Sequence, residues 1–102
     1  MNVVFHPAAQ NEAQKTTAHY TGIHKQLGVD FRIELERAVS RIVQAPTAWH
    51  PIKKDYRRCI LNRFPFGVIY RANQSKNECQ VLRLCISKEN RDTGNLVLFN
   101  MA

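Results

Sequence analysis

The spacing of hydrophobic residues changes along the chain, from helical in the first half to strand-like in the second. The clearest helical pattern repeats every three or four positions and comprises Phe31, Leu35, Ala38, Ile42 and Ala45. We expect Gly28 to precede this helix and Pro46 to end it. Polar residues such as Glu34 and Arg37 fall elsewhere on the helix, which predicts a solvated, ion-paired face.

A first helix is expected from Ala8 to about His24. Pro7 suits its first turn, where a missing N–H costs nothing. Ala9, Ala13 and Tyr20 lie on one side of this helix. The apolar run 3–5 before it predicts a short strand. Two helices joined by a short glycine-containing link predict an antiparallel hairpin.

The second half predicts strands at about 56–62, 66–72 and 79–86, with a loop at 45–55 before them. In the last of these strands, simple alternation places two sets on opposite faces: Leu82, Leu84 and Ile86 against Val81, Arg83 and Cys85. An apolar stretch, 96–99, closes the chain as a further strand or a tail. The expected fold is α+β, a single domain over 1–102. An N-terminal strand and an α-helical hairpin pack on one face of a 3–4-stranded antiparallel sheet.

Charge adds a functional hint. The 102 residues carry a net charge of +7, which favours polyanions or acidic protein surfaces as partners. The excess lies in the sheet half, so we expect a cationic open face that binds a partner through Arg57, Arg58, Arg63, Arg71, Arg83 and Arg91. We expect no membrane segment and no signal peptide, and hence a cytoplasmic protein. No basic recognition helix for DNA is visible.

The cysteines and histidines predict neither a metal site nor a cofactor. The three cysteines include no C-x-x-C pair, and the four histidines show no ligand spacing. Cys59 and Cys85 fall inside strand patterns and are expected as buried, reduced thiols. Phe64, Phe66 and Tyr70 are expected in the core, where they would not form a stacking platform for nucleobases.

Several stretches together resemble the RelE/ParE superfamily of toxins from bacterial type II toxin–antitoxin systems. The segment Asn62-Arg63-Phe64-Pro65-Phe66-Gly67-Val68-Ile69-Tyr70 is similar to the R-F-P-[YF]-x-[VI]-x-Y signature of ParE-type plasmid stabilisation proteins. The other matching stretches are 6–9 with Glu12-Ala13, 31–35 and 42–46. The resemblance covers roughly residues 3–86.

The resemblance implies a cognate antitoxin as partner, with DNA contacted mainly through that antitoxin. ParE-like members act on DNA gyrase, whereas RelE-like members are endoribonucleases that cleave messenger RNA on the ribosome. Metal-independent cleavage needs a general base and cations for the phosphate. RelE-type enzymes supply a lysine pair and an arginine, and Gly67 stands at that arginine's place. The remaining candidates here are Lys53, Lys54, Arg57, Arg58 and Arg91. Guanidinium is a poor base, so the sequence favours the ParE-like, non-enzymatic interpretation.

Two alternatives stay open. One is a RelE-like endoribonuclease, and the convergence of those five cations on one concave patch would favour it. The other is a diverged toxin that retains only antitoxin binding. The segment 87–96 lacks the histidine and aromatic pair usual in ParE-like chains, which favours this second alternative.

Overall fold

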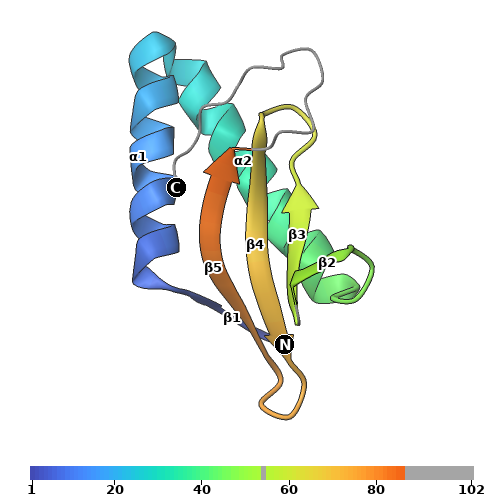
Figure 1. The fold of residues 1–102 in the computed structure, drawn as a ribbon. Helices are drawn as coiled ribbons and strands as arrows, with labels where there is room; N and C mark the ends of the chain where they lie inside the picture. The colour runs from blue at the N-terminus through green and yellow to red at the C-terminus, as the bar shows by residue number, and fades with distance from the viewer. Residues whose placement is uncertain (54, 87–102) are drawn as a thin grey trace.

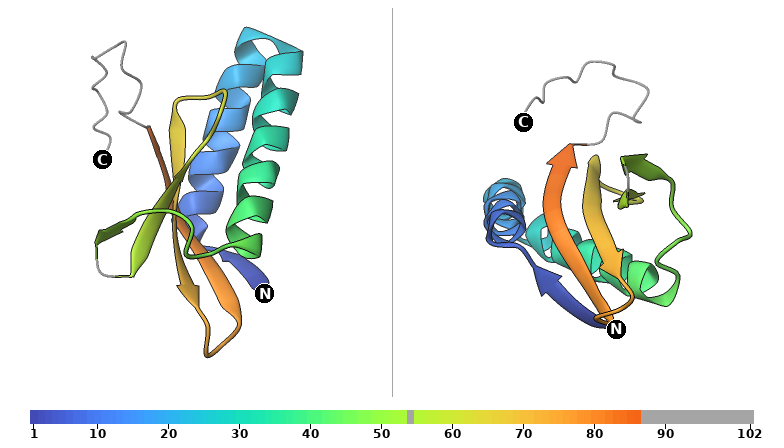
Figure 2. Two further views of the ribbon diagram at one scale, coloured as in Figure 1. Left: turned by 90° about the vertical axis from the view of Figure 1, so that its right-hand side faces the viewer. Right: turned by 60° about the horizontal axis from the view of Figure 1, so that its bottom comes forward.

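The computed structural model describes residues 1–53 and 55–86. Within them the elements follow in the order shown in Figure 1: β1 (Asn2–Phe5), α1 (Pro7–Ile23), α2 (Lys25–Gln44), β2 (Pro51–Lys53), β3 (Tyr56–Ile60), β4 (Phe66–Asn73) and β5 (Glu78–Ile86). The strands form one sheet in the order β1-β5-β4-β3-β2. Both helices lie together on one side of it (Figure 2). This arrangement confirms the predicted α+β class. The apolar stretch 96–99 lies outside the described residues.

The sheet is larger than predicted and is mixed. β1 pairs parallel with β5, whereas the other neighbouring strands are antiparallel. β2 lies inside the segment predicted as a loop. Its three residues are all exposed, so it carries no buried-and-exposed alternation that could have revealed a strand. The described sheet therefore has five strands instead of three or four.

The start of α1 follows the prediction. Pro7 occupies the first helical position, and the preceding residue, His6, caps the helix. Ala9 is fully buried, and Ala13 and Tyr20 pack against the core from the same side of the helix. The His6 N–H donates to the Val81 carbonyl oxygen at 2.8 Å, which fixes the start of α1 to β5.

The break predicted at Gly28 is wrong, because α2 already begins at Lys25 and His24 alone separates the helices. Gly28 is buried within α2, at the close approach of α1. A Cβ at this position would collide with the Thr21 hydroxyl and would come within 3.1 Å of the Thr21 Cα. The glycine therefore permits close helix packing and does not end a helix.

The core lies between the hairpin and the sheet. The predicted apolar face of α2 is buried at Phe31, Leu35, Ala38 and Ile42. Phe64, which follows β3, lies with its ring centroid 4.9 Å from that of Tyr20 and 5.3 Å from that of Phe31. Tyr70 is fully buried, and Phe66 and Trp49 pack on the margin of the cluster. These aromatic residues therefore build the core, as the sequence predicts.

Glu34 departs from the predicted solvated face of α2. Its exposure is 5%, and its Oε2 accepts a hydrogen bond from the Asn62 backbone N–H at 2.8 Å. The exposed pair on α2 is instead Arg32 with Glu36, at 3.8 Å. The Asn62 N–H in the turn after β3 needs an acceptor, and the buried Glu34 carboxylate needs a donor. The hydrogen bond between them satisfies both groups.

The predicted alternation along β5 fails at a β-bulge. Ile69 on β4 pairs with Arg83, but the next residue, Tyr70, pairs with Val81, so Leu82 is the extra residue. The extra residue reverses the side-chain alternation beyond it. Val81 and Leu84 are consequently both buried, although simple alternation places them on opposite faces.

Candidate functional site: the open face of the sheet

We define the open face as the side of the sheet away from the helices, which is turned toward the viewer in Figure 1. The other side carries the fully buried Cys59, Val68 and Tyr70. Register pairing places the following residues on the open face: Asn2, Val4, Lys53, Tyr56, Arg58, Ile60, Gly67, Ile69, Arg71, Asn73, Glu78, Gln80, Arg83 and Cys85. The face therefore mixes cations with apolar side chains and carries the carboxylate of Glu78, next to Gln80.

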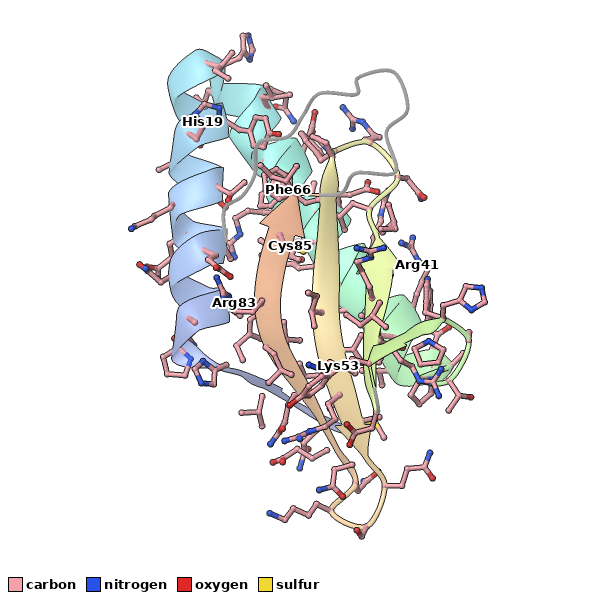
Figure 3. The ribbon with its side chains drawn as sticks, in the orientation of Figure 1. His19, Arg41, Lys53, Phe66, Arg83 and Cys85 are labelled. Carbon is pink, nitrogen blue, oxygen red and sulfur yellow. The ribbon has the colours of Figure 1, made fainter. Side chains whose placement is uncertain are left out.

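Arg71 lies in the row of the open face that runs from β1 to β2. Its Nη2 donates to the Gln80 Oε1 at 2.9 Å, and its guanidinium carbon lies 5.5 Å from the centre of the Tyr56 ring. Stacking on an aromatic ring holds a guanidinium without consuming its donors. Lys53, labelled over the lower half of the sheet in Figure 3, pairs in register with Tyr56 at the end of this row.

Arg58 lies across Gly67 in the middle of the open face. A Cβ on Gly67 would be 3.0 Å from the Arg58 Cγ and 3.1 Å from its Cδ. The stem of Arg58 thus covers the bare backbone of Gly67 and makes that glycine buried. Any larger residue at 67, such as the arginine of RelE-type enzymes, would have to displace Arg58.

Arg57 points the other way, because neighbouring residues of a strand alternate between faces. It pairs with Tyr70, and its Nη1 donates to the Trp49 carbonyl oxygen at 2.6 Å. The Tyr70 hydroxyl donates to the Pro46 carbonyl oxygen, also at 2.6 Å. Burial raises the pKa of Tyr70 to about 12, and the nearby Arg57 charge opposes the rise. Arg57 and Tyr70 hold the segment after α2 against the sheet.

Two further arginines are tied to the helices. Arg63 lies 3.4 Å from Asp30 on α2, and hydrogen bonds from Gln26 and then Arg63 hold the pKa of Asp30 below its usual value. Arg83 lies between α1 and β5 in Figure 3 and donates to Glu12 Oε2 through Nε and Nη2. The hydrogen bonds to Glu12 raise the pKa of Arg83.

The predicted binding residues therefore separate into groups. Arg58, Arg71 and Lys53 share the open face, Arg83 lies at its edge, and Arg57 faces the helices. Arg63 lies beside α2. Lys54 and Arg91 lie outside the described residues. Among the described members of the candidate ribonuclease set, Arg57 is turned away from Arg58 and Lys53, so these three do not converge.

Sequence reasoning missed a hollow between the two helices. It has a volume of about 910 Å³, and the floor between α1 and α2 is made by Ala13, Thr17, Leu35 and Val39. Gln14 on α1 and the pair Arg32 and Glu36 on α2 form its rims. The sequence signal for this hollow is weak. The hollow is lined on α1 by small residues, and small residues are equally common where two helices simply pack together.

The expectation of a buried thiol is confirmed for Cys59 but not for Cys85, which is half-buried on the open face of the sheet. Cys59 and Cys79 are fully buried. Burial raises the pKa of both thiols, and for Cys59 the nearby Arg41 guanidinium opposes the rise. Within the described ranges, no three His, Cys, Asp or Glu side chains are grouped to hold a metal ion. No helix in the same ranges is long and apolar enough to cross a bilayer.

Comparison with known proteins gives no match in sequence but clear matches in structure. No family model and no curated protein matches the chain. A chain of the chromosomal ParDE toxin–antitoxin system from P. aeruginosa superposes with a TM-score of 0.72 at 18% identity, covering 85% of this chain and 96% of that one. The chain has the RelE/ParE toxin fold.

Two E. coli structures extend the comparison within the same fold. A chain of the intact RelBE toxin-antitoxin complex gives a TM-score of 0.63 at 16% identity, covering 81% of this chain and 92% of that one. The isolated E. coli RelE toxin gives a TM-score of 0.65 at 15% identity, covering 89% of this chain and 88% of that one. These chains share one fold at low sequence identity, because many hydrophobic sequences of the right pattern and total volume can build the same core.

Proposed function

We propose that this chain is the toxin component of a bacterial type II toxin–antitoxin system. In this proposal it is ParE-like, acts in the cytoplasm as a non-enzymatic inhibitor of DNA gyrase, and is neutralised by a cognate antitoxin. The observation that carries the proposal is the RelE/ParE toxin fold combined with a cationic, partly apolar open face. Function on a shared fold is decided by the site, so the open face is the surface to test.

The chemistry of the open face supports a protein target. Arg58 and Arg71 are separated by Ile69 and Tyr56, so charged and apolar groups alternate across the surface. Arginine is enriched in protein interfaces because its planar guanidinium binds carboxylates in a bidentate manner and also packs on flat surfaces. An acidic protein surface would satisfy both properties.

The endoribonuclease alternative has less support. Cleavage at the 2′-hydroxyl needs a group that can accept a proton near neutral pH, and arginine cannot do so. Lys53 is the described lysine on the open face, and Arg57 is committed to the Trp49 carbonyl oxygen. This alternative therefore depends on Lys54 and Arg91 joining Lys53 and Arg58.

The hollow between α1 and α2 supports the antitoxin part of the proposal. Its apolar floor and polar rims have the pattern that receives one face of an amphipathic helix. A partner helix on this side would leave the open face of the sheet accessible from the other. If the partner covers only the hollow, a diverged toxin could keep antitoxin binding after losing its target.

Induced expression in a bacterium tests the proposal, with incorporation of labelled thymidine and labelled methionine followed separately. We expect DNA synthesis to fall first. The substitutions Arg58→Gln and Arg71→Gln together should relieve this inhibition. Arg32→Gln with Arg37→Gln removes two exposed positive charges from α2 and serves as the matched control that keeps inhibition.

The other outcomes identify the alternatives. Translation that collapses before DNA synthesis would support the endoribonuclease and would contradict gyrase inhibition. Normal synthesis of both polymers would indicate a diverged toxin, and co-purification with its neighbouring gene product would then test antitoxin binding alone.

A further inference from the structure

Both helices begin at a histidine that acts as the N-cap. The Nδ1 atom of His6 accepts a hydrogen bond from the Ala8 N–H at 3.0 Å. The Nδ1 atom of His24 accepts one from the Gln26 N–H at 3.2 Å. Serine, threonine, aspartate and asparagine are the usual residues at this position, and none of them changes its acceptor near neutral pH.

An imidazole can accept this hydrogen bond only when it is neutral. Protonation puts hydrogen on both ring nitrogens and leaves no acceptor. It also places a positive charge at the positive end of the helix dipole. Neither helix has an acidic residue in its first turn to offset that charge. Histidine is the side chain that changes charge between about pH 5 and 8.

Each capping histidine also connects its helix to another element. The His6 N–H donates to the Val81 carbonyl oxygen on β5, and its own carbonyl oxygen accepts from Gln10 at 3.0 Å. The His24 N–H donates to the Tyr20 carbonyl oxygen at 2.9 Å, and its carbonyl oxygen accepts from Leu27 at 3.0 Å. His24 is thus the entire connection between α1 and α2.

We propose that His6 and His24 make the helical hairpin sensitive to pH, so that acidification through the histidine range removes both caps and destabilises the hairpin on the sheet. The hollow and the apolar face of α2 belong to this hairpin, so its stability bears on any partner bound there. This inference does not depend on the proposed function.

The two capping histidines have different charged neighbours. Asp30, one turn into α2, interacts electrostatically with His24 and is itself held by Gln26 and Arg63. Lys25 follows His24 directly in sequence. The nearest acid along α1 from His6 is Glu12, which is engaged by Arg83 and by the Leu84 N–H.

Urea unfolding of the full chain at pH 7.5 and 5.5 tests the proposal. We expect the unfolding equilibrium constant of the wild-type chain to rise on acidification by about fivefold for each cap lost. The variant His6→Asn with His24→Asn keeps an acceptor that does not titrate, so its stability should change little between the two pH values. The matched control is His19→Asn with His50→Asn, at two exposed histidines that cap no helix. His19 lies in the upper part of α1 in Figure 3.

Amide hydrogen exchange locates the effect. In the wild-type chain, protection of the Ala8 and Gln26 amides should fall on acidification beyond the intrinsic change in exchange rate, and the asparagine variant should keep it. Equal pH dependence in the two double variants would overturn the proposal. So would unchanged protection of both amides between pH 7.5 and 5.5.

Discussion

Tyr70 links the core of the molecule to the segment that follows α2. Its ring is fully buried, and its hydroxyl donates to the Pro46 carbonyl oxygen at 2.6 Å. Arg57 lies beside it and holds the Trp49 carbonyl oxygen three residues further on. A phenylalanine at 70 would fill the same space but would leave the Pro46 oxygen without its partner.

We therefore expect Tyr70→Phe to lower the free energy of unfolding by about 1–2 kcal/mol. The pKa of Tyr70 in the folded chain is about 12, above the ordinary value of 10.0. The neutral phenol is thus stabilised by folding, and this contribution is present below pH 10 and is lost as the pH rises toward 12. Urea unfolding and the ultraviolet absorbance of phenolate measure the two effects. A wild-type chain whose tyrosines all titrate at pH 10 would contradict this account of Tyr70.

At the scale of elements, the closest approach of the two helices depends on the absence of a side chain at Gly28. Substitution Gly28→Ala places a methyl group against Thr21, whose hydroxyl already donates to the Thr17 carbonyl oxygen. The backbone of α1 must then move away, and overpacking of this kind costs about 1–3 kcal/mol.

Gly22 provides the matched control, because a Cβ there would meet nothing within 4 Å. Gly22→Ala in α1 should stabilise the chain by about 0.5–1 kcal/mol through helix propensity. Thermal unfolding of the two variants should therefore shift in opposite directions. If the melting temperatures of both variants shift in the same direction, the helical hairpin can accommodate a methyl group at Gly28, which would contradict this prediction.

The elements that the sequence predicts correctly are those set by local pattern. Phe31, Leu35, Ala38 and Ile42 repeat at helical spacing, and period-two runs mark β3 to β5. Apart from β2, whose exposed residues carry no strand pattern, the errors involve contacts between separate elements. Gly28 depends on Thr21 of the other helix, and buried Glu34 depends on the turn at Asn62. The parallel pairing of β1 with β5 and the bulge at Leu82 depend on how strands meet across the whole chain.

The candidate site could be predicted only in part for the same reason. Charge counting finds the arginines, but the face on which each lies is set by strand register. Arg57 and Arg58 are neighbours in sequence and point to opposite sides of the sheet. The hollow between α1 and α2 has no residue type of its own to mark it in a sequence.

At the scale of the whole molecule, the distribution of the +7 charge should matter more than its total. Arg58, Arg71 and Lys53 share one face, whereas Arg32 and Arg37 lie on α2, where Glu36 lies beside Arg32. A cluster of like charges produces a summed potential that attracts polyanions, and this potential is screened beyond about 8–10 Å at ordinary salt.

Elution from a heparin column tests this distribution. Arg58→Gln with Arg71→Gln should elute at clearly lower salt than Arg32→Gln with Arg37→Gln, although both variants lose two positive charges. The second variant should elute close to the wild-type chain, because the charges it loses lie on another face and one of them is already paired. Circular dichroism should give the same helix content for all three chains, which excludes unfolding as the cause. If the two variants elute at the same salt concentration, net charge alone governs retention. That result would contradict the claim that the open face is the cationic surface of the molecule.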